Sequence, residues 1–160
     1  MTEYIDWTIR IRVNKFELNG SFSVLIFLGD IPDDPAEWMS SPSYVGAHRA
    51  FSGGYGSPDD PDAITEGFVH LNSAIAEKSG LSSFDPKEVV PYLKRQLGWR
   101  IQKASEANRS PVAAGDVPSL QVVVIATPMR MNEGEPFPEP CGDPKHHHEI
   151  TSGKAGGYAE

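Results

Sequence analysis

The sequence has 160 residues, the usual length of one domain, of which 39% are hydrophobic and 22% are charged. A formal net charge of −8 without a basic cluster argues against a nucleic-acid partner. The single cysteine, Cys141, excludes an intrachain disulfide and a four-cysteine metal site. Residues 1–7 lack the basic start and apolar run of a signal peptide, and the longest apolar run, 24–28, is too short to span a membrane. We therefore expect a cytoplasmic protein without a membrane partner.

The first half of the chain is patterned for β-structure. Apolar and polar residues alternate strictly over 4–13, which predicts a strand with one buried and one wet face. The run Phe22–Leu28 is apolar on both faces, which predicts a central strand covered on both sides. Asn19 and Gly20 lie between these segments and are typical of a hairpin turn, so the two strands are expected to pair.

The middle of the chain predicts further strands over 44–51, 67–75, 99–103 and 120–126, with long loops over 29–43 and 52–66. A chain with 15 glycines and 14 prolines is expected to contain such loops and little helix. Five or six strands with so little helix predict a mainly β fold, an antiparallel β-sandwich or barrel, over residues 1–132.

One short helix is predicted near 86–97. Asp85 is a suitable N-cap, Pro86 suits the first helical position, and Glu88 is spaced to complete a capping box. Gly98 can end the helix. Pro91 lies inside this segment and removes a backbone donor, so the helix is expected to split there.

Residues 133–160 are rich in proline and glycine and show no apolar periodicity, which predicts an extended C-terminal tail that is mobile at its end. The tail contains Cys141, His146, His147 and His148, whose thiol and imidazoles suit copper or zinc. Two interpretations stay open here: weak copper binding, or a solvated tract without a ligand. We expect no firmly bound cofactor.

The sequence lacks a recognisable catalytic constellation. His48 and His70 lie on separate predicted strands, and neither a metal-binding histidine spacing nor a nucleophile motif accompanies them. Four aromatic residues lie in loops, namely Trp38, Phe51, Tyr55 and Phe137. Such residues either fold back over the core or contact a partner, so binding is favoured over catalysis.

Several segments, in a consistent order over about residues 4–130, resemble the C-terminal domain of fungal tyrosinases (polyphenol oxidases). They are Tyr4-x-Asp6-Trp7, Phe22–Gly29, Trp38 with Ser43–Gly46 and Phe51, Gly67–Leu71, 81–97 and Trp99-Arg100.

This resemblance implies a fold like the C-terminal β-domain of haemocyanins and a regulatory, non-catalytic function. In the family, the domain covers the dicopper site of a latent pro-enzyme, an aromatic side chain occupies the substrate position, and proteolysis releases it. The implied partner is the dicopper catalytic domain, whose histidine-rich segments are missing from this sequence. Phe51 is the first candidate for the plug and Tyr55 the second, while a strand-end core position is the alternative for Phe51.

The sequence departs from the family at one point. Some members carry a Cys-x-x-Cys motif in the long loop, associated with copper loading, whereas residues 52–66 contain no cysteine. The Cys141 and His146–His148 segment is the only substitute. Two other functions therefore stay open: a free-standing carbohydrate- or protein-binding domain that uses Trp38 and Tyr55, and a copper carrier that uses the tail.

Overall fold

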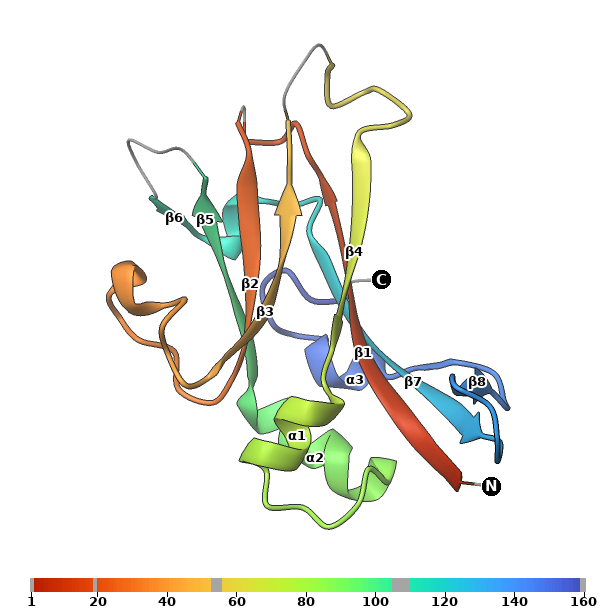
Figure 1. The fold of residues 1–160 in the computed structure, drawn as a ribbon. Coiled ribbons are helices and arrows are strands. Elements are labelled where there is room, and N and C mark those ends of the chain that lie inside the picture. Colours follow the sequence, from red (N-terminus) through yellow and green to blue (C-terminus); the bar gives the residue numbers. More distant parts are fainter. Residues whose placement is uncertain (1, 19, 53–55, 105–109, 159–160) are drawn as a thin grey trace.

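The computed structural model describes residues 2–18, 20–52, 56–104 and 110–158 (Figure 1). Two antiparallel sheets pack face to face and enclose the core (Figure 1). Sheet A has the order β4 (Ile64–His70), β1 (Thr2–Asn14), β7 (Gln121–Met131) and β8 (Glu139–Pro140), and β9 (Lys145–His146) also pairs with β7. Sheet B has the order β3 (Tyr44–Ala50), β2 (Phe22–Leu28), β5 (Leu97–Lys103) and β6 (Pro111–Val112). The predicted mainly β, antiparallel fold is confirmed.

Helices are few and short. They are α1 (Asn72–Lys78), α2 (Pro86–Gln96) and α3 (His148–Thr151), with single 3₁₀ turns η1 (Pro35–Glu37) and η2 (Ala114–Asp116). Helices α1 and α2 close one end of the two sheets (Figure 1). Within the described part of the chain, every helix lacks the length and apolar character needed to cross a bilayer.

Strand β1 follows its predicted alternation. Its inward residues Trp7, Ile9, Ile11 and Val13 are fully buried, because the strand pairs with β4 on one side and β7 on the other and turns one face to the core. Strand β2 also lies where expected, between β3 and β5, and all of its residues are buried.

The predicted hairpin between these two strands is wrong. Strands β1 and β2 belong to different sheets, and the connection that contains Gly20 passes from sheet A to sheet B. Asn19 lies outside the described residues. An Asn-Gly pair indicates only a local backbone preference for a turn. Strand β2 is apolar on both faces, and both faces are buried because it is an inner strand of sheet B.

The segment after β4 also differs from the prediction. The strand expected over 67–75 ends at His70, and helix α1 begins at Asn72. The Asn72 side chain accepts a hydrogen bond from the Trp7 backbone N–H (2.7 Å) and donates one to the Ile5 carbonyl (2.8 Å). These two hydrogen bonds between Asn72 and β1 turn the chain away from the sheet. The local pattern of apolar residues does not predict them.

Helix α2 forms where predicted and continues unbroken through Pro91. Its buried face of Val89, Tyr92 and Leu93 outweighs the one backbone hydrogen bond that the proline removes. Asp85 caps the helix by accepting from the Lys87 N–H (2.9 Å). The capping box is different from the one expected. Ser83 Oγ accepts the Asp85 N–H and donates to the Glu88 carboxylate.

The helix ends at Gln96, and strand β5 follows immediately at Leu97. Gly98 therefore lies within the strand, and the prediction that it ends the helix is wrong.

The expectation of an extended C-terminal tail is wrong for residues 139–157. Strands β8 and β9 pair with β7, and α3 buries Ile150 and Thr151. Farther on, Trp99 Nε1 donates to the Ala155 carbonyl (3.0 Å), and Lys154 Nζ donates to the carbonyls of Lys94 and Leu97 at the end of α2. These contacts are mostly made by backbone atoms, so a hydrophobicity pattern does not reveal them.

The two sheets approach each other at strands β3 and β4. His48 of β3 lies against Gly67 of β4, where a Cβ atom would stand 2.2 Å from the His48 Nδ1 atom, and Val69 lies against Gly46 in the same way. A hydrogen bond joins His48 Nε2 and Thr65 Oγ1 (3.2 Å). Burial lowers the pKa of His48 from its ordinary value. The sheets thus lean together into a half-barrel at this seam.

The packing of the C-terminal segment can be tested with Ile150→Ala. Because Ile150 is 1% exposed, its truncation should lower the free energy of unfolding by about 2–5 kcal/mol, measured by urea denaturation. The matched control is Ile64→Ala in β4, where the side chain is 56% exposed and the expected change is within about 0.5 kcal/mol. Equal, small changes in both variants would show that the segment is not part of the core.

The seam predicts a pH dependence of stability. Because the pKa of His48 is lower in the folded protein than the value of about 6.5 in the unfolded chain, the unfolded chain binds the proton first as the pH falls. His48 therefore contributes a loss of stability that begins near that unfolded pKa and grows toward acid pH. His48→Gln should lose fewer degrees of Tm between pH 7 and pH 5 than the wild type. An unchanged loss in His48→Gln would contradict this account.

Candidate functional site

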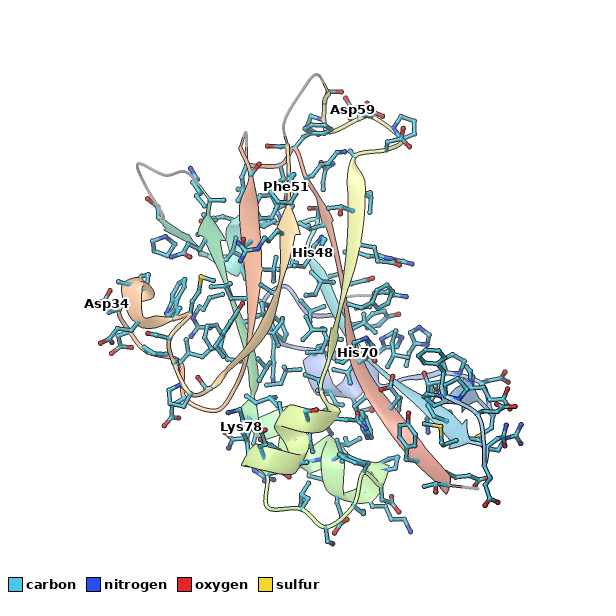
Figure 2. All side chains as sticks on the ribbon, viewed as in Figure 1. Asp34, His48, Phe51, Asp59, His70 and Lys78 are labelled. Atoms are coloured by element: carbon cyan, nitrogen blue, oxygen red, sulfur yellow. The ribbon has the colours of Figure 1, made fainter. Side chains whose placement is uncertain are left out.

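Phe51 directly follows the last residue of β3, at the end of the fold opposite α1 and α2 (Figure 2). Its side chain is 69% exposed, whereas Ala50 before it is fully buried. The alternative that Phe51 is a strand-end core residue is therefore wrong. An aromatic ring held at the rim of a sandwich and left in solvent is typical of a contact residue.

The loop that begins at Phe51 is anchored by the β1–β2 connection. The Ser52 N–H donates to Ser21 Oγ (3.1 Å), and Asn14 Nδ2 donates to the Pro58 carbonyl (2.9 Å). The end of the loop is held by the Lys15 N–H, which donates to the Ala63 carbonyl (2.9 Å). These bonds hold the loop at its beginning, at Pro58 and at its end, and the first of them lies directly after Phe51.

Gly56 packs closely against the β1–β2 connection. The ring of Phe16 lies where a side chain would project from Gly56, with its Cζ atom 2.1 Å from the position of a Cβ. Any other residue would displace the ring. Tyr55, the second candidate for the plug, lies outside the described residues, and its role stays a prediction.

Trp38 is placed differently from the expectation of an exposed loop aromatic. It is buried and packs edge-on against Phe27 of β2, with ring centroids 6.5 Å apart. Its Nε1 donates to the Pro32 carbonyl (2.7 Å). Together with Leu25, these side chains form a small second core on the outer face of sheet B. Trp38 thus fastens the loop 29–43 onto β2, and its ring is not available for a partner contact here.

The C-terminal histidines do not converge on one point. The rings of His146 and His148 lie side by side, with centroids 5.7 Å apart, and His148 stacks on Tyr158 at 3.6 Å. His147 points the other way, because it is buried against Trp7 at 5.2 Å and its Nδ1 bonds to Glu149 Oε1 (2.6 Å). Cys141 is exposed and unpaired. In the described ranges, no three His, Cys, Asp or Glu side chains form a group that could hold a metal ion.

The charge around His146 also acts against a bound cation. Burial lowers the pKa of His146, and the neighbouring Arg10, His148 and Arg12 lower it further. Of the four predicted metal ligands, the structure therefore leaves His146 and His148 as the only adjacent pair, in a positively charged neighbourhood.

Sequence reasoning missed two features of the surface. Phe68 and Ile64 of β4 are both more than half exposed, and their spacing in a strand places them on one face. The sequence shows this spacing, but the exposure of the two side chains follows only once β4 is known to lie at the edge of the sheet. Two clefts of about 630 and 620 Å³ also lie where the loop after β2 meets the end of α2, and both are lined by Asp30, Arg95 and Gln96. The clefts are formed by chain crossings, which no local pattern predicts.

The comparisons with known proteins agree with one another. The family model described as the tyrosinase C-terminal domain matches residues 6–124. The chain is 30% identical to a tyrosinase of Neurospora crassa over 98% of its own length and 24% of that protein. It is 32% identical to polyphenol oxidase 2 of Agaricus bisporus over 84% of its length and 23% of that protein. The chain thus spans about a quarter of the relatives it matches.

Solved structures agree with this result. A structure of recombinant mushroom tyrosinase matches 91% of the chain with a TM-score of 0.66 and 26% identity, and the match covers 25% of that protein. A structure described as containing latent and active mushroom tyrosinase matches the same share with a TM-score of 0.70 and 25% identity.

The histidine geometry predicts weak copper binding. Two adjacent imidazoles form an incomplete ligand set, so copper(II) uptake should be weak and should depend on His146 and His148. Isothermal titration calorimetry should show that His146→Ala abolishes this uptake, while Cys141→Ser leaves it unchanged. Loss of binding in Cys141→Ser would instead support a site that includes the thiol.

Proposed function

Since this chain belongs to the family of tyrosinase C-terminal domains, we propose that it is a regulatory, non-catalytic domain that covers the dicopper site of a fungal tyrosinase. In this proposal, Phe51 enters the substrate position and keeps the enzyme latent until proteolysis separates the two domains. The carrying observation is the exposure of Phe51 at the start of a loop that is anchored at Ser52 and at Pro58.

The chemistry of phenylalanine suits this role. Its ring has the size and shape of a phenol, and it lacks the hydroxyl group that a copper site would oxidise. Tyr55 carries such a hydroxyl and is for that reason the second choice. An aromatic anchor that fills a pocket commonly dominates the energy of an interface, so one ring is sufficient to block a narrow entrance.

Covalent attachment strengthens a weak contact. Two domains joined by a short linker meet at an effective concentration in the millimolar range, so that modest intrinsic affinity keeps the site closed. Cutting the linker removes this advantage, and the plug then dissociates. The relatives are whole tyrosinases of which this chain matches about a quarter, which supports the catalytic domain as the partner.

The test is a chimera in which this chain replaces the matching segment of the Neurospora crassa tyrosinase. The chimera should be latent, and Phe51→Gly should raise phenol oxidation without proteolysis by roughly tenfold or more, because the blocking ring is removed. The matched control is Phe137→Gly, which removes a ring that is 77% exposed in the C-terminal segment and should leave latency unchanged. If neither Phe51→Gly nor Tyr55→Gly increases activity, the assignment of the plug is wrong.

A further inference from the structure

The outer face of sheet A, which is turned away from the core, carries an unusual set of side chains. The antiparallel register places Phe68 of β4 beside Arg10 of β1, and Glu66 beside Arg12. On the other side of β1, Val123 of β7 lies beside Arg10. Arg10 therefore lies between an aromatic and an aliphatic side chain on this face.

The C-terminal segment extends the same face. His146 of β9 pairs with Ile125 of β7, and His148 follows two residues later with its ring on Tyr158. Val123 is fully buried although it belongs to the outer face, which indicates that its neighbours cover it. The outer face of sheet A is thus covered, around Val123, by side chains that pack against one another.

The positive charge of Arg10 is poorly compensated. Arg12 is paired with Glu66, and the Asp6 carboxylate accepts the hydroxyl of Thr8. Arg10 instead makes one long hydrogen bond from its Nη2 to Gln121 Oε1 (3.5 Å). Its Nε is buried and has no hydrogen-bond partner among the residues that the structure describes. Burial, and then the neighbouring Arg12, lower the pKa of Arg10, and the Glu66 carboxylate offsets part of this effect.

Two exposed apolar side chains of β4 lie on the same face, with Glu66 between them. Phe68 is 53% exposed and Ile64, four residues earlier on β4, is 56% exposed. Because alternate residues of a strand share a face, both side chains lie on the outer face of sheet A with Arg10 and Arg12. Strand β4 begins where the anchored loop from Phe51 ends, so the face and the candidate plug are joined by one loop.

We propose that Arg10, Arg12, Ile64 and Phe68, here called the Arg10–Phe68 face, dock against a carboxylate-bearing surface of the dicopper catalytic domain. This inference rests on the proposed function and adds a second contact to it. A partner carboxylate can accept from the Arg10 guanidinium, whose one hydrogen bond from Nη2 to Gln121 is long, and Ile64 and Phe68 lose their exposure to water. Two separated contacts also fix the orientation of the domain, so that Phe51 is directed at one position.

The test uses the same chimera with a protease site engineered into the linker. After cleavage, the dissociation constant of the two chains is measured by isothermal titration at low and at high salt. Arg10→Glu should raise this constant by roughly tenfold or more at low salt and should reduce its dependence on salt, because the charge pair becomes a repulsion. Phe68→Ser should weaken binding without changing the salt dependence.

The matched control is Arg100→Glu on β5, which makes the same change of charge on sheet B and should leave the dissociation constant unchanged. Circular dichroism melts confirm that each variant folds, and Arg10→Gln replaces Arg10→Glu if the latter does not. If the wild-type chains associate and the Arg10 and Phe68 variants associate equally well, the docking face is wrong and the proposed function stands. If the uncut chimera is fully active, the proposed function fails and this inference fails with it.

Discussion

The burial of Trp7 at the centre of β1 is the interaction on which the rest of the fold depends. Its backbone N–H and its indole Nε1 donate to Asn72 Oδ1 (2.7 Å) and to the Phe84 carbonyl (2.9 Å), which hold the start of α1 and the approach to α2. Its ring contacts His147 of the C-terminal segment. Removing a buried tryptophan costs about 3–5 kcal/mol in general. One side chain of sheet A therefore joins the helical end of the fold to the last part of the chain.

The contrast between β1 and the C-terminal segment shows which parts of this fold a sequence can predict. Strands β1 and β2 were predicted correctly, because burial of one face or of both leaves a period in the order of apolar residues. Strands β8 and β9 are held by backbone hydrogen bonds to β7 and by isolated anchors such as Ile150, which leave no period. The hairpin expected at Asn19 and Gly20 was wrong because a turn motif does not predict which sheet the next strand joins.

The candidate site shows the same division. The exposure of Phe51 agrees with its expected place in a loop, while its role as the plug stays a proposal. The burial of Trp38 could not be predicted, because its cover is supplied by Phe27 and the Pro32 carbonyl through the folding of its own loop. The alternation in β4 is visible in the sequence, but the exposure of Phe68 follows from the position of β4 at the border of sheet A.

The seam between β3 and β4 has a consequence for the solubility of the domain. Each of these strands is the border of its sheet, and a long open border can template pairing with another chain and lead to aggregation. Here the two borders face each other across Gly46 and Gly67, while β6 and β8 at the opposite borders are two residues long. Short or mutually shielded borders are the arrangement by which natural β-proteins avoid such pairing. Two glycines that permit the close approach of β3 and β4 thus also protect the molecule from self-association through its sheets.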